Sequence, residues 1–229
     1  MKFIKRLIIL LLIVAIIVGT IFIINGKKMY DDALNGSTLQ SVIDNIRQDK
    51  NYIKSEDLPK NYLNAVIAVE DHRFKDHGAI DIIAIGRAFW VNITTLSLRE
   101  GGSTITQQVA KNIFFVEETD VVTRKIAEIF AAIDLEKTYQ KEEILELYVN
   151  TIYFGDGYYG IKEACNGYLD IEPSKMTLYD STMMAGIPNA PSAYAPTVNP
   201  ELTKSRQKKV ISDMIAYGYL SQEEADKLK

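Results

Sequence analysis

A carboxylate at the end of an apolar run is the first feature that could carry out chemistry. Glu70 follows residues 65–69, Ala-Val-Ile-Ala-Val, and opens the polar segment 70–77. Burial against apolar side chains disfavours the charged form of a carboxyl group and suits it to proton transfer near neutral pH. The alternative is an acid at a helix end that pairs with Arg73 at the surface, where an ion pair contributes little. The residue types alone favour the two interpretations equally.

A second polar segment combines hydroxyls, amides and an ammonium group. Residues 101–112 read GGSTITQQVAKN. The paired glycines allow backbone conformations closed to other residues, and the serine and threonine that follow are candidate helix caps. On the expected helix, Gln107 and Lys111 share a face one turn apart, with Gln108 beside them. These groups suit a ligand rich in hydroxyls or phosphates, although the spacing of a phosphate-binding P-loop is absent.

A pair of opposite charges lies further along the chain, where Arg124 precedes Glu128 by one helical turn and Lys125 adds a second cation. A pair with this spacing is most often a solvated ion pair, here in the less favourable order with the cation first. Spacing alone therefore does not assign this pair a function.

Residues 205–208, Ser-Arg-Gln-Lys, match the SxxK spacing of a serine nucleophile. The SDN and KTG segments that accompany such a nucleophile are absent from the sequence. The surrounding residues are charged and typical of an exposed helix, so we expect no serine nucleophile and no covalent labelling by β-lactams.

The composition excludes several classes of protein. Cys165 is the only cysteine among 229 residues, so no disulfide framework can form within the chain, and two histidines make a zinc site improbable. The first 28 residues carry five basic side chains and no acid, so the remaining 201 hold 21 basic and 30 acidic side chains. A domain this acidic lacks the basic surface of a nucleic-acid-binding protein.

An uncharged apolar run near the N-terminus predicts a membrane anchor. Residues 7–24 contain no charge and would span about 27 Å as a helix, close to the thickness of a bilayer's hydrocarbon core. A cleaved signal peptide is the alternative, but its apolar region is shorter and ends at a small-residue cleavage site, which is absent here. We therefore expect an anchor at residues 1–28 and a domain at 29–229, with the flanking charges favouring a domain outside the cytoplasm.

The remaining sequence predicts a mainly α single domain with hardly any alternating strand pattern. Apolar spacing of three and four residues predicts the helices, which are expected at 62–70, 80–98, 121–139, 142–153 and 177–187. A last helix begins with the capping box of Ser221 and Glu224. Polar joints that contain glycine are candidate positions for chemistry, and they lie at 70–81, 99–108 and 154–160.

Five segments in register resemble one family, the peptidoglycan glycosyltransferases of family 51, found alone or as the first catalytic module of bifunctional penicillin-binding proteins. GGSTITQQ is identical to the family's second motif, and the other motifs match residues 70–77, 124–128, 141–161 and 185–200. The resemblance runs from about residue 55 to 220. Two positions depart from the family pattern: Ala79 stands at a usual glycine, and Asp120 stands where an arginine often precedes Arg124.

The resemblance implies polymerisation of lipid II with inversion and release of undecaprenyl diphosphate. In the family, Glu70 would be the general base and Glu128 a second essential acid, acting through a divalent cation such as Mg²⁺ or Mn²⁺ or by organising basic residues. Positive charge would stabilise the diphosphate leaving group. The residues expected to bind substrate are Asp71, Phe74, Ser103, Thr104, Gln107, Gln108, Lys111, Arg124 and Lys125.

The resemblance also implies a lysozyme-like helical fold with a smaller lobe that touches the membrane. Residues 80–98 are the candidate for that lobe, and a plain core helix explains them nearly as well. No tightly bound cofactor is expected. The expected partners are the membrane, lipid II, the growing lipid-linked glycan and cell-wall transpeptidases, in a monofunctional enzyme.

Two other classes of function remain open. A lytic muramidase of the same fold would also use a glutamate but would need no site for a lipid diphosphate, and Lys111 and Arg124 argue against it. A non-catalytic scaffold for wall assembly would need no paired acids in a cleft.

Overall fold

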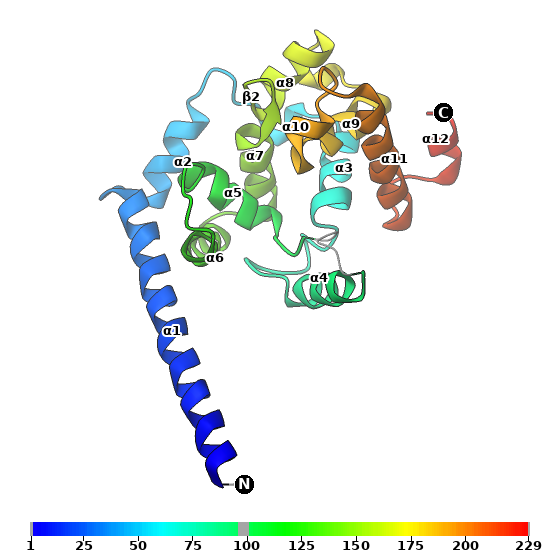
Figure 1. The fold of residues 1–229 in the computed structure, drawn as a ribbon. Coiled ribbons are helices and arrows are strands. Elements are labelled where there is room, and N and C mark those ends of the chain that lie inside the picture. Colours follow the sequence, from blue (N-terminus) through cyan, green and yellow to red (C-terminus); the bar gives the residue numbers. More distant parts are fainter. Residues whose placement is uncertain (1, 96–100, 229) are drawn as a thin grey trace.

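The computed structural model describes residues 2–95 and 101–228 and is mainly α-helical, as the sequence predicts. The first helix, α1 (Lys2–Leu34), extends away from the rest of the molecule (Figure 1). It is long and apolar enough to cross a membrane, and almost all of its side chains between residues 7 and 24 are exposed. Its length and its exposed apolar surface fit the membrane span that the sequence predicts.

Eleven further helices and one hairpin follow in the described residues. The helices are α2 (Leu39–Arg47), α3 (Lys60–Glu70), α4 (Ile82–Thr95), α5 (Ile105–Phe114), α6 (Val121–Thr138), α7 (Lys141–Thr151), α8 (Gly160–Leu169), α9 (Leu178–Gly186), α10 (Pro191–Tyr194), α11 (Pro200–Ala216) and α12 (Gln222–Asp226). Short 3₁₀ turns lie at Ser55–Asp57, Pro173–Lys175 and Ile187–Asn189. The hairpin pairs β1 (Tyr153–Gly155) with β2 (Tyr158–Tyr159), and its turn uses positive φ at Asp156 and Gly157.

Side-chain caps fix where several helices begin. Thr104 caps α5 and forms a reciprocal capping box with Gln107, which confirms one of the two expected caps. Asp120 caps α6 by accepting hydrogen bonds from the Thr123 amide and hydroxyl, at 3.2 and 2.6 Å. The capping box of Ser221 is also confirmed. Each cap pairs an amide that the helix leaves without a partner at its first turn.

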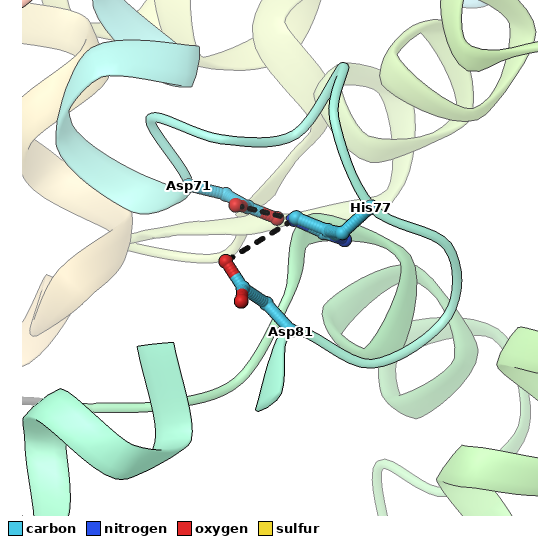
Figure 2. A group of neighbouring side chains, drawn as sticks. All are labelled: Asp71, His77 and Asp81. Atoms are coloured by element: carbon cyan, nitrogen blue, oxygen red, sulfur yellow. Dashed lines mark hydrogen bonds and ion pairs between the residues drawn. The ribbon is translucent and has the colours of Figure 1, made fainter. Parts of the chain in front are cut away.

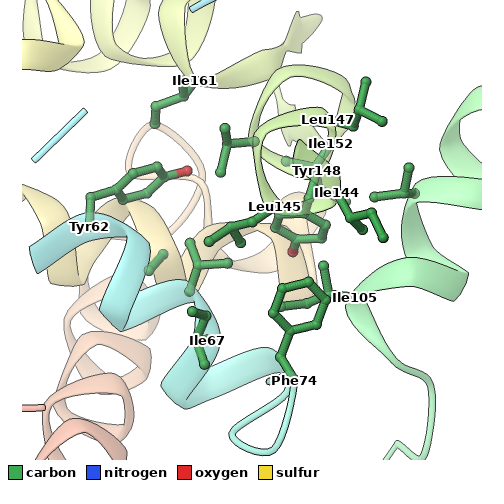
Figure 3. Close-up of a cluster of buried hydrophobic side chains, with 14 of the residues drawn as sticks. Tyr62, Ile67, Phe74, Ile105, Ile144, Leu145, Leu147, Tyr148, Ile152 and Ile161 are labelled. Atoms are coloured by element: carbon green, nitrogen blue, oxygen red, sulfur yellow. The ribbon is translucent and has the colours of Figure 1, made fainter. Parts of the chain in front are cut away.

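The core surrounds α7, which contacts α5, α6 and α8, while α3 packs on α9 and α11. Side chains on several faces of α7 are buried because other helices pack around it. Figure 3 shows Tyr148 of α7 in one buried cluster with Tyr62 of α3, Ile105 of α5 and Phe74. This packing holds the C-terminal end of α3 and the N-terminal half of α5 in fixed positions.

The anchor helix does not end where the sequence placed the domain boundary, between residues 28 and 29. α1 continues to Leu34 and packs on α6, and Tyr30 is buried with its ring edge-on to Phe114, 5.7 Å between centroids. The boundary therefore falls inside a continuous helix whose last turns are part of the domain core.

Helix α4 forms a small lobe on the side of the molecule toward which α1 extends (Figure 1). Its apolar side chains are exposed, Trp90 to 69%, and Ala88 is the one residue of α4 that is buried. The alternative of a core helix is therefore wrong. The expected helix also included residues 96–98, which lie outside the described residues.

Candidate active site

One cleft gathers most of the residues that the sequence singled out. It has a volume of about 400 Å³ and lies where the C-terminal end of α3 meets α5 and α6. Eight of the eleven expected site residues line it, and its lining residues are Val69, Glu70, Gly101, Ser103, Gln107, Gln108, Lys111, Asn112, Arg124, Lys125, Glu128, Ile152, Pro188 and Asn189. Segments more than a hundred residues apart in sequence therefore form one polar site.

Glu70 is a buried carboxylate at the end of α3, with a side chain that is 8% exposed. Its Oε2 accepts a hydrogen bond from Gln108 Nε2 at 2.9 Å, whereas its buried Oε1 has no hydrogen-bond partner among the described residues. Burial raises the pKa of Glu70, although Gln108 and Arg206 oppose that shift. The surface pair with Arg73 is excluded, because Arg73 Nε donates instead to Asp81 Oδ2 at 2.9 Å.

Glu128 is a second buried carboxylate, and two cations neutralise it. Its side chain is 3% exposed, and its Oε2 accepts from Lys125 Nζ at 2.8 Å while Oε1 lies 3.3 Å from Arg124 Nε. The expected solvent-exposed ion pair between Arg124 and Glu128 is not found. The face of α6 that carries these two residues packs toward α5 and lines the cleft. Arg124 and Lys125 are thereby held at the cleft wall.

Further donors complete the polar wall. Lys125 Nζ also donates to Ser103 Oγ at 2.7 Å. Lys111 is exposed and has no ion-pair or hydrogen-bond partner in the described part of the chain. The buried Asn112 Nδ2 likewise has no hydrogen-bond partner among those residues. An ammonium and an amide without protein partners are free to bind an anionic or hydroxyl-rich ligand.

Comparison with known proteins identifies the family. Residues 35–215, more than half of the chain, match the family model described as Transglycosylase. The chain belongs to the transglycosylase family. This membership makes the matched residues a peptidoglycan glycosyltransferase domain.

The similar proteins are longer than this transglycosylase. Penicillin-binding protein 1F of Bacillus subtilis is 39% identical over 200 residues, which cover 87% of this chain and 27% of that protein. Penicillin-binding protein 1A of Neisseria flavescens is 41% identical over 179 residues, which cover 78% of this chain and 22% of that protein. The chain thus spans about a quarter of the length of these relatives. A crystal structure of penicillin-binding protein 1A from Haemophilus influenzae covers 78% of this chain and 17% of its own, with 23% identity and a TM-score of 0.47, a similarity too weak to bear on the site.

Three expected substrate contacts of the transglycosylase domain do not line the cleft: Asp71, Phe74 and Thr104. Asp71 accepts hydrogen bonds through both oxygens, from His77 Nε2 at 2.8 Å and from the Ile105 amide at 3.0 Å. Phe74 is 1% exposed in the core, and Thr104 donates to the Ala79 carbonyl at 2.9 Å. These side chains are buried because they fasten the segment after α3 to the start of α5.

Asp71, His77 and Asp81 are close enough to suggest a metal site (Figure 2). Their ligating atoms already have protein partners, since Asp81 accepts from the amides of Ile83 and Ala84 and from Arg73. The cluster is therefore a hydrogen-bonded network that stabilises the loop between α3 and α4. Within this loop Ala79 has a negative φ, so the backbone at this position does not require glycine.

The cleft also fits a divalent cation poorly. Mg²⁺ and Mn²⁺ take several oxygen ligands, most often from carboxylates, carbonyls and water. Glu128 already has Arg124 and Lys125 on its two oxygens, and Glu70 is the one other carboxylate that lines the described cleft. No step of the chemistry is assigned to a metal on this geometry.

Sequence reasoning missed Arg206, which comes from α11 and lies 3.7 Å from Glu70 Oε1. The expectation of an exposed helix at residues 205–208 holds for Ser205 and Lys208, but Arg206 and Gln207 turn inward. The local pattern carried no signal of this, because the partner of Arg206 is 136 positions away in sequence. Asn112, Ile152 and Asn189 line the cleft as well and were not among the expected contacts.

Proposed function

We propose that this domain polymerises lipid II into glycan strands and releases undecaprenyl diphosphate. The observation that carries the proposal is one cleft whose lining includes the buried carboxylate Glu70 and the three cationic side chains of Lys111, Arg124 and Lys125. A reaction that takes a proton from a hydroxyl and expels a diphosphate needs this combination, a base on one side and positive charge on the other.

Glu70 acts as the general base. Its carboxylate accepts the proton from the 4-hydroxyl of the acceptor sugar as the hydroxyl oxygen attacks the anomeric carbon of the lipid-linked chain, with inversion and release of the lipid diphosphate. A raised pKa strengthens a carboxylate as a base, and burial raises the pKa of Glu70 while Gln108 and Arg206 oppose the rise. Gln108 fixes the orientation by binding Oε2.

Lys111, Arg124 and Lys125 stabilise the negative charge that develops on the departing diphosphate. Glu128 organises this charge by holding Arg124 and Lys125 in place, and it does so without a metal. Ser103, Gln107 and Gln108 present hydroxyl and amide groups to the sugars. A muramidase would need no cationic wall, so these residues favour synthesis over cleavage.

The membrane holds both the enzyme and its lipid-linked substrate. α1 spans the bilayer, and the exposed apolar face of α4 contacts it from the same side as α1. The basic residues before α1's apolar run favour a cytoplasmic N-terminus and a domain outside, and we propose cell-wall transpeptidases as its partners there.

The experiment that tests this function is incubation of the full-length protein in detergent with purified lipid II. Synthesis of polymer supports the proposal. Shortening of preformed glycan would instead support a muramidase, and no change in either substrate would support a scaffold.

The topology is tested by labelling intact cells with a membrane-impermeant thiol reagent. Cys165 is buried and its pKa is raised to about 12 by that burial, so it is unreactive. We expect labelling of Lys175→Cys, an exposed position on the domain, in intact cells. The matched control Lys5→Cys, before the apolar run, should react only after permeabilisation, and the reverse pattern would place the domain in the cytoplasm.

A further inference from the structure

Helix α11 approaches the Glu70 carboxylate through one side chain, Arg206. Its Nη2 lies 3.7 Å from Glu70 Oε1, and the two side chains are 14% and 8% exposed. A separation of 3.7 Å is too long for a hydrogen bond, so the interaction is one of charge. Between poorly hydrated groups such an interaction is much stronger than at the surface.

Three contacts hold the Arg206 side chain in this position. Its Nε donates to the carbonyl of Gly186 at 3.3 Å, and its guanidinium lies 5.7 Å from the centroid of the Tyr194 ring. The stem packs on Gly186, where an added Cβ would come within 3.0 Å of Arg206 Cγ. The end of α9 and helix α10 therefore fix the cation before any substrate arrives.

We propose that Arg206 is a positioning residue for Glu70, one that holds the carboxylate in place through its charge and leaves Oε1 free of hydrogen bonds. This inference rests on the proposed role of Glu70 as the base. A cation that donated a hydrogen bond directly to the carboxylate would weaken it as a proton acceptor. At 3.7 Å, Arg206 attracts the carboxylate and still leaves the lone pairs of Oε1 open.

The charged groups around Glu70 determine whether its pKa rises or falls when Arg206 is replaced. Burial raises the pKa of Glu70 most, Gln108 of α5 and Arg206 of α11 lower it, and the neighbouring Asp71 raises it. Tyr148 of α7 also faces this group and stays neutral, since burial and the Glu70 charge raise its pKa well above the ordinary range. Removal of Arg206 must therefore raise the pKa of Glu70 and move the loss of base activity to higher pH.

The test compares the pH dependence of lipid II polymerisation by full-length wild type, Arg206→Met and Arg206→Lys. For Arg206→Met we expect kcat to fall roughly tenfold or more at neutral pH, with partial recovery as the pH rises and little change in KM. Arg206→Lys should restore much of the rate, because it keeps the charge. Lys208→Met removes the same charge from an exposed position of α11 and should match wild type.

A second measurement reports on the base itself. The carboxyl carbon of Glu70 is titrated by NMR in the ¹³C-labelled protein in detergent, assigned by its loss in Glu70→Gln. We expect the midpoint to move to higher pH in Arg206→Met, and in Arg206→Gln should the methionine variant not fold. This titration requires no turnover, so it separates failure of this inference from failure of the proposed function.

An unchanged titration midpoint together with an unchanged pH profile would overturn the inference. A loss that is equal at every pH and appears as a raised KM would overturn it too, because Arg206 would then bind substrate instead. If wild type itself makes no polymer, the proposed function fails, while a shifted Glu70 midpoint would still support the contact.

Discussion

The two buried glutamates of the cleft have different partners, and those partners separate their roles. Glu128 has a cation at each oxygen, at 2.8 and 3.3 Å. Glu70 has an amide at one oxygen and a guanidinium at 3.7 Å from the other. A carboxylate enclosed by cations is a poor proton acceptor, whereas a carboxylate whose pKa is raised by burial is a better one.

At the scale of single residues, the sharpest prediction concerns Glu70→Gln. The amide keeps the shape of the side chain but cannot accept a proton, so lipid II should still bind while glycan formation falls by about 10²–10⁴. Single-turnover polymerisation measured at matched stability checks this.

The matched control is Asp76→Asn, which makes the same chemical change at an exposed position of the loop that follows Glu70. It should retain wild-type turnover. A loss smaller than about tenfold for Glu70→Gln, below the range of a general base, would show that another group takes the proton.

At the scale of elements, the start of α6 matters because this helix carries Arg124, Lys125 and Glu128 to the cleft. The resemblance suggested that an arginine at position 120 would add charge for the diphosphate. The structure instead gives Asp120 a capping role, with hydrogen bonds to the Thr123 amide and hydroxyl. Those bonds lower the pKa of Asp120, so the stability it contributes is present above its unfolded-state pKa and is lost as the pH falls.

We therefore expect Asp120→Arg to lower the melting temperature rather than to improve substrate binding. Asp120→Asn keeps a capping oxygen and should melt close to wild type near neutral pH. Calorimetry and lipid II binding by the three proteins measure the two effects separately. Tighter binding by Asp120→Arg at an unchanged melting temperature would contradict the capping role.

At the scale of the whole molecule, α1 combines a candidate membrane span with a structural support for the domain. Its last turns pack on α6, and Gly26 sits so close that an added Cβ would meet Ile126 Cγ2 at 2.5 Å and the Ala127 amide nitrogen at 3.2 Å. Glu128 is the next residue along α6. The membrane helix thus supports the turn that holds the cationic wall of the cleft.

A side chain at position 26 should therefore weaken both stability and activity. We expect Gly26→Leu to destabilise the fold by about 1–3 kcal/mol, the usual cost of overpacking, and to slow polymerisation by displacing α6. Thermal unfolding in detergent measures the first effect, and the lipid II assay the second.

Gly19→Leu is the matched control, because nothing lies within 4 Å of a Cβ built at that position of the same helix. It should resemble wild type in both assays. Equal behaviour of the two variants would show that α1 serves as a tether alone.

The amino-acid sequence by itself determined what depends on near neighbours along the chain. Apolar runs and apolar spacing predicted α3, α4, α6, α7 and α9, whereas α2, α8 and α10 were not predicted. The capping box at Ser221 and the candidate cap Thr104 predicted two helix starts, because caps join residues close in sequence. The same locality explains why Gln107 and Lys111 were correctly placed on one face of α5. Uninterrupted hydropathy predicted the anchor, and its charge-free length needs no tertiary information.

Only the tertiary structure decided what depends on segments distant in sequence. It turned Arg206 toward Glu70, buried Phe74 and Asp71 behind the cleft wall, and joined the end of α1 to α6. The surroundings of a side chain depend on which helices pack around it. The packing of the helices depends in turn on contacts among all the side chains of the core. The residue types for acid–base chemistry were therefore readable in the sequence, whereas the orientation of the base required the fold.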